Sequence, residues 1–124
     1  MGTPIRIIIE DLVLEAELSD TPCAEAIARI LPIEAVPHVW GDELYFEIPV
    51  SLPPDETATT RVNAGDIGYW PPGRALAIFF GRTPMSTDDR PVPASAVNPV
   101  GAIRGDAAVL RGVRGARRIR IEKV

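Results

Sequence analysis

The fold is decided by the most apolar stretch of the chain, residues 65–80, which reads GDIGYWPPGRALAIFF. Two apolar runs, 67–70 and 76–80, lie on either side of Pro71-Pro72-Gly73, a sequence typical of a tight turn in which glycine takes a positive φ. This pattern predicts an antiparallel hairpin. We expect the hairpin to be the central pair of strands in a mainly-β protein.

Residues 5–18 predict a second hairpin nearer the N-terminus. Apolar residues alternate along 5–9 and again along 12–18, and only Glu10-Asp11 separates the two runs. The sequence predicts one helix after this hairpin. Thr21 is a good N-cap and Pro22 suits the first helical position, so we expect a short amphipathic helix that plugs one end of the sheet.

Cys23 lies in the first turn of that helix, where the helix dipole lowers the pKa of a thiol. No base or second thiol accompanies it in the sequence, and we interpret it as a small structural residue. Because Cys23 is the only cysteine, no intramolecular disulfide can form.

Residues 33–48 predict a third hairpin around the turn Gly41-Asp42. Counting back from the turn pairs His38 with Tyr45. The register places Val39, Leu44, Phe46 and Ile48 on the core face, and Trp40, His38, Tyr45 and Glu47 on the other.

The remainder of the chain predicts two loops and two more strands. The loops cover residues 49–63 and 81–99, the strands 100–103 and 117–124, and a helical turn covers 106–113. Loops as long as 81–99 are unusual in a small domain and often carry function. Hairpins throughout describe a closed or nearly closed antiparallel β-barrel or sandwich of seven or eight strands, in a single domain over 1–124.

Charge and apolar runs exclude several classes of protein. Residues 1–60 hold twelve acidic residues and two arginines, whereas 61–124 hold eleven basic and five acidic residues. Alternation of Arg118, Ile119, Arg120 and Ile121 is typical of a strand whose charged face pairs with the acidic half, so we expect no nucleic-acid partner. No apolar run is long enough for a signal peptide or a spanning helix, so we expect no membrane partner and a cytoplasmic location.

Four segments resemble the small prokaryotic cyclophilin-like family, namely residues 40–48 (WGDELYFEI), 65–73, 77–84 (AIFFGRTP) and 93–101 (PASAVNPVG). The members of this family are short proteins of unknown function that are similar to cyclophilins in fold. The resemblance implies a closed or nearly closed barrel of about eight strands with one short plugging helix. His38 stands in Pro37-His38-Val39-Trp40, which departs from the Phe-His-x-x-x-Arg type of segment in true cyclophilins.

We expect one concave apolar pocket beside the 82–99 loop, with no catalytic group, metal or cofactor. Arg82 follows an aromatic pair and either holds a ligand carbonyl or carboxylate or pairs with Asp88 or Asp89. Asn98 either binds a ligand or makes an ordinary turn before proline. The candidate ligand-binding residues are Tyr45, Glu47, Tyr69, Phe80, Arg82, Ser95 and Asn98.

Three functions remain open at this point. The first is a non-catalytic module that binds a small molecule or peptide. The second is a weak peptidyl-prolyl isomerase with Arg82 as the donor that polarises the amide. The third is an accessory subunit of a larger enzyme assembly, acting as a homo-oligomer or with a protein partner.

Overall fold

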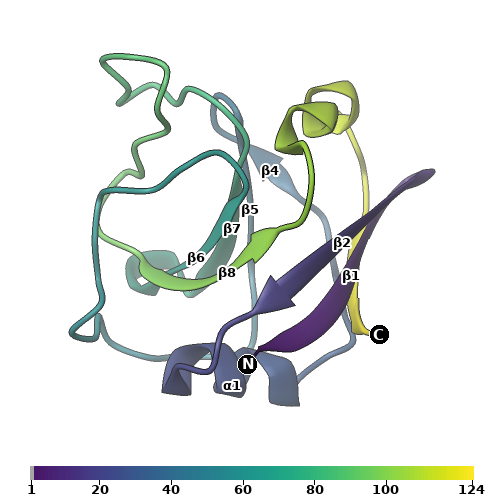
Figure 1. Cartoon of the computed structure of the whole chain (residues 1–124), viewed down its shortest axis with the longest axis vertical. Helices are drawn as coiled ribbons and strands as arrows, with labels where there is room; N and C mark the ends of the chain where they lie inside the picture. The colour runs from purple at the N-terminus through teal and green to yellow at the C-terminus, as the bar shows by residue number, and fades with distance from the viewer. Residues whose placement is uncertain (1) are drawn as a thin grey trace.

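A computed structural model describes residues 2–124, which form one curled, antiparallel, nine-stranded sheet (Figure 1). The strand order is β3-β9-β1-β2-β8-β6-β7-β5-β4. The strands are β1 (Thr3–Ile9), β2 (Leu12–Leu18), β3 (Ile33–Ala35), β4 (His38–Val39), β5 (Glu43–Glu47), β6 (Asp66–Trp70), β7 (Ala75–Phe79), β8 (Asn98–Ile103) and β9 (Ile119–Lys123). The helices are α1 (Pro22–Arg29) and the 3-10 turns η1 (Pro71–Gly73) and η2 (Ala107–Val113).

Two of the three predicted hairpins are confirmed, although the 65–80 hairpin, expected to be the central pair, supplies the sixth and seventh strands of the nine-strand order. Strands β1 and β2 pair around Glu10-Asp11, with Ile9 opposite Leu12. Strands β6 and β7 pair around η1, and β7 lies between β6 and β5. One detail differs from the expected turn, because the positive φ falls on Arg74, at 48°, and not on Gly73.

The hairpin predicted over residues 33–48 is only half right. His38 pairs with Tyr45 as expected, but β3 leaves the hairpin and pairs with β9. The chain therefore crosses from one edge of the curled sheet to the other between Ala35 and His38. Val39, expected in the core, is 44% exposed because β4 is a two-residue edge strand.

Helix α1 covers the end of the main core, as predicted. The Thr21 side chain accepts a hydrogen bond from the Ala24 amide at 3.2 Å. Ile27 is fully buried, and α1 packs against β8 and β2 beneath the sheet (Figure 1). Burial raises the pKa of Cys23, so the possible lowering by the helix dipole is wrong and the structural interpretation is supported.

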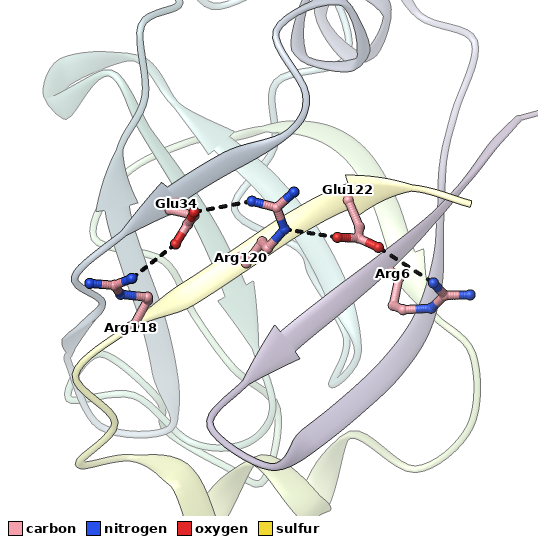
Figure 2. A network of polar contacts seen from close by, with 5 residues as sticks. All are labelled: Arg6, Glu34, Arg118, Arg120 and Glu122. Atoms are coloured by element: carbon pink, nitrogen blue, oxygen red, sulfur yellow. Dashed lines mark hydrogen bonds and ion pairs between the residues drawn. The ribbon is translucent and has the colours of Figure 1, made fainter.

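The acidic and basic halves of the chain meet on the outer side of β3, β9 and β1 (Figure 2). Glu34 accepts from Arg118 at 3.2 Å and from Arg120 at 3.0 Å, and Glu122 joins Arg120 to Arg6. Arg111 and Arg114 of the C-terminal half bind the carboxylate of Asp42 in the same way. These four arginines of the basic tail are thus paired with the acidic half.

The part of the chain that the structure describes contains no helix that is long and apolar enough to cross a membrane.

Candidate functional site

Strand β7 is buried on both of its faces, and this creates a second, smaller core. Leu76 and Ile78 point into the main core, whereas Ala77 and Phe79 point to the opposite face of the sheet. Val62 and Val97 pack against them from the two long loops. An antiparallel sheet usually leaves one face to solvent, so the covered face is unusual and depends on those loops.

The two loops are fastened to each other over that face. Thr59 and Val97 form an isolated antiparallel bridge, with N–O distances of 2.9 and 3.0 Å. Gly68 of β6 makes room for it, because a Cβ there would lie 2.8 Å from Cγ2 of Val97. Glycine at this position therefore lets the 81–97 segment lie close against the sheet.

A cavity of about 150 Å³, partly open to solvent, lies next to this cluster. Ala77 and Phe79 of β7 line it, and three further aromatic side chains, from three different segments, form part of its walls. Such a volume suits one small organic group, since a water molecule in the liquid takes about 30 Å³. The lining residues are Trp40, Glu43, Tyr45, Trp70, Ala77, Phe79, Pro93, Ala94 and Val97.

Two of the aromatic walls are held in place by specific contacts. The indole Nε1 of Trp70 donates to Oγ of Ser95 at 2.7 Å, which ties β6 to the loop. The ring of Tyr45 packs against that of His38 with centroids 5.3 Å apart. The cavity is therefore preorganised by the protein's own contacts, which lowers the cost of ordering a site when a ligand binds.

Glu43 is the one charged side chain among the nine lining residues. It is 8% exposed, and its Oε1 is buried without a hydrogen-bond partner in the described chain. Burial raises the pKa of Glu43 from 4.5 to about 7, because the apolar surroundings disfavour the charged form. A buried acceptor without a hydrogen bond is costly and rare in folded proteins. The Glu43 carboxyl is the polar group of the cavity that lacks such a bond.

The family profile of cyclophilin-like proteins matches residues 3–122. The chain belongs to the cyclophilin-like family. A solution structure of a hypothetical protein from Archaeoglobus fulgidus is similar to this cyclophilin-like chain over 99% of its length and 95% of that protein's, with 38% sequence identity and a TM-score of 0.81. No curated protein matches the chain. The resemblance seen in the sequence is thereby confirmed, as is the mainly-β cyclophilin-like fold.

Of the seven candidate residues in this cyclophilin-like chain, the structure places Tyr45 in the cavity wall and Ser95 beside it. Two others hold the fold together. The Tyr69 hydroxyl donates to the Val50 carbonyl at 2.6 Å and accepts from the Leu52 amide at 3.2 Å. The Asn98 side chain accepts from the Asp55 amide at 3.0 Å, and so fastens the 49–63 loop.

The other three candidates also lie outside the cavity lining. Phe80 is 1% exposed and belongs to the main core, on the opposite side of the sheet from Phe79. Glu47 is exposed and pairs with Arg74 at 2.8 Å. Arg82 is exposed, although its backbone carbonyl accepts from the Asp42 amide at 2.7 Å.

Sequence reasoning missed Glu43, Trp40 as a wall and the Pro93–Val97 side of the cavity. A signal for Glu43 was present in the alternation of β5, which puts it on the same face as Tyr45 and opposite Leu44. Within residues 2–124, no group of three histidine, cysteine or carboxylate side chains is placed to hold a metal.

Proposed function

We propose that this cyclophilin-like protein is a non-catalytic binding module that takes a small molecule, or a side chain of a peptide, into the cavity between β5, β7 and the 81–97 loop. A single observation carries the proposal. A preformed apolar cavity walled by two tryptophans and Tyr45 contains one unsatisfied carboxyl oxygen, on Glu43. Apolar walls with a few placed polar groups are typical of ligand sites.

Non-catalytic binding is favoured over isomerisation by the composition of the walls. The isomerase hypothesis assigns the polarising donor to Arg82, and none of the nine lining residues is an arginine. The proposed setting is the cytoplasm, in keeping with the one buried thiol of Cys23.

Intrinsic fluorescence tests the proposal directly, because Trp40 and Trp70 are the only two tryptophans of the chain and both line the cavity. We expect members of a panel of small cyclic amines, alcohols, amides and short peptides to change the emission saturably. Ala94→Phe should abolish the response, because Ala94 lies in the lining and a phenyl ring there fills the cavity.

Ala102→Phe is the matched control, since Ala102 is also exposed but lies on β8, away from the cavity. It should leave the response unchanged. A panel with no saturable response, or a response that survives Ala94→Phe, contradicts the proposal.

A further inference from the structure

The lining of the proposed binding site combines one acidic residue with apolar and aromatic ones, and this composition indicates a class of ligand. The inference rests on the proposed function. Every lining residue except Glu43 presents an aromatic ring, an aliphatic surface or a proline. The cavity therefore offers one acidic acceptor and several electron-rich ring faces, and no cationic side chain among its nine residues.

We infer that the cavity binds the ammonium group of a small alkylamine or of an amine-bearing side chain, with Glu43 as its anionic partner and Trp40, Tyr45 and Trp70 around it. An N–H of the ammonium would donate to the unsatisfied carboxyl oxygen. Ring faces attract cations, and most strongly where the cation is shielded from water.

Among residues 2–124, no ion pair or hydrogen bond joins Glu43 to a cationic side chain. Arg111 and Arg114 bind the carboxylate of the neighbouring residue Asp42, at 3.2 and 2.9 Å. Burial is the cause that raises the pKa of Glu43, without a contribution from a neighbouring charge. A bound ammonium would supply the missing counter-charge and so convert an unfavourable buried carboxylate into a paired one.

Linkage gives this inference a signature in pH. An ammonium ion stabilises the ionised form of Glu43, whose pKa in the free protein is about 7, so binding at lower pH must first remove a proton. Affinity for the amine is expected to fall about tenfold from pH 8 to pH 6, as the ionised fraction of the carboxyl falls. A neutral ligand of the same shape has no such dependence.

The titratable and charged groups around Glu43 are few. Tyr45 lies on the same strand, His38 lies on β4 against the Tyr45 ring, and Asp42 lies in the turn with its two arginines. Strand β7 contributes Ala77 and Phe79, β6 contributes Trp70, and the loop contributes Pro93, Ala94 and Val97. Because histidine side chains change charge in the same pH range, His38→Gln is the control for the pH profile.

The experiment compares three probes that share one apolar group and differ only in the polar end: 3,3-dimethylbutylamine, 3,3-dimethylbutan-1-ol and 3,3-dimethylbutanoate. Each is titrated into the isotope-labelled protein at pH 6, 7 and 8, and the indole N–H signals of Trp40 and Trp70 are followed. We expect the amine to bind at least about tenfold more tightly than the alcohol at pH 8, and the carboxylate to bind most weakly.

Two variants distinguish an effect of the Glu43 carboxyl from an effect of the protein's overall charge. Glu43→Gln should remove both the preference for the amine and the pH dependence. Glu47→Gln removes a carboxylate from the same strand, four residues away and outside the cavity, and should change neither. The probe comparison on the unaltered protein needs no variant, so it stands even if Glu43→Gln folds poorly.

Equal affinity for amine and alcohol, a preference for the carboxylate, or an amine affinity that is unchanged by Glu43→Gln overturns the inference. If the alcohol binds at the tryptophans as well as the amine does, the ligand class is wrong while the binding module stands. If none of the three probes shifts either indole signal, the inference falls, and the fluorescence panel with Ala94→Phe decides the proposed function separately.

Discussion

At the scale of single residues, Glu43 is expected to make folding depend on pH. Its pKa is about 7 in the folded protein against 4.5 for a free glutamate, so the folded state binds the proton more tightly. The resulting stabilisation is complete below pH 4.5 and is lost as pH rises to about 7. Relative to Glu43→Gln, the free energy of unfolding should fall by roughly 2–3 kcal/mol between about pH 5 and pH 8.

Urea denaturation of both proteins across that pH range measures the difference. If the difference in free energy of unfolding between the wild-type protein and Glu43→Gln stays constant with pH, the carboxyl is solvated, which contradicts its burial. Glu47→Gln, at the exposed end of the same strand, should run parallel to the wild type.

Tyr69 and Tyr45, which were both expected to bind a ligand, lie in different surroundings. The Tyr69 hydroxyl is buried and satisfies the Val50 carbonyl and the Leu52 amide. Tyr69→Phe leaves both without that partner and should lower the free energy of unfolding by roughly 2 kcal/mol. Thermal or chemical denaturation checks this, with half-buried Tyr45→Phe as the variant that should lose less.

At this scale the sequence predicted which face of a strand a side chain lies on, but not whether that face is buried. Alternation assigned Tyr45 to the face of β5 opposite Leu44 and Phe46, which is correct. Whether that face is covered depends on the 81–97 segment, which has no periodicity from which its path can be predicted. Glu43 was therefore not among the predicted site residues, whereas Asn98 and Tyr69, whose partners lie in the 49–63 loop, were predicted as ligand groups.

At the scale of elements, the approach of the 81–97 loop to β6 depends on Gly68. A methyl group there would lie 2.8 Å from Val97, whose backbone is fixed by its bridge to Thr59. Gly68→Ala should therefore displace Val97, lower the free energy of unfolding by roughly 1–3 kcal/mol and weaken binding in the cavity. Gly112→Ala, with no atom within 4 Å of the new methyl group, should do neither.

Denaturation and the tryptophan titration measure the two effects on the same samples. Unchanged stability and binding in Gly68→Ala would contradict the packing of the loop against β6.

The ion-pair network of β3, β9 and β1 makes a smaller contribution (Figure 2). Glu34→Gln removes the shared partner of Arg118 and Arg120 and should lower Tm by only about 2–4 °C, because the pairs are exposed. The loss should shrink further in molar salt, which screens exposed charges. A loss that is insensitive to salt would contradict an electrostatic origin.

Elements joined by short turns were predictable, and long-range pairings were not. Two turn sequences each indicate a hairpin without information from elsewhere in the chain, namely Glu10-Asp11 and Pro71-Pro72-Gly73. Strand β3 has only three residues and its partner β9 lies at the other end of the chain, so nothing in residues 33–35 indicates that pairing. Only a tertiary arrangement in which the sheet curls brings the two together.

At the scale of the whole molecule, the two faces of the curled sheet carry different features. The inner face holds the main core, which α1 covers at one end, and the outer face of β5, β7 and β6 carries the cavity beneath the two long loops. The cyclophilin-like fold was predictable from family-like segments that span the chain. The position of the cavity was not, because it depends on how the loops cross the sheet.

An amide and indole NMR titration of the labelled protein with the tightest binder of the fluorescence panel tests this placement most directly. We expect saturable shifts that cluster at Trp40, Glu43, Tyr45, Trp70 and Val97. We also expect no acceleration of cis–trans exchange when the ligand is an Xaa-Pro peptide, whose spontaneous exchange takes tens of seconds or more. Shifts centred on Phe80 and Arg82, or fast exchange of the peptide, would contradict a non-catalytic site on the outer face.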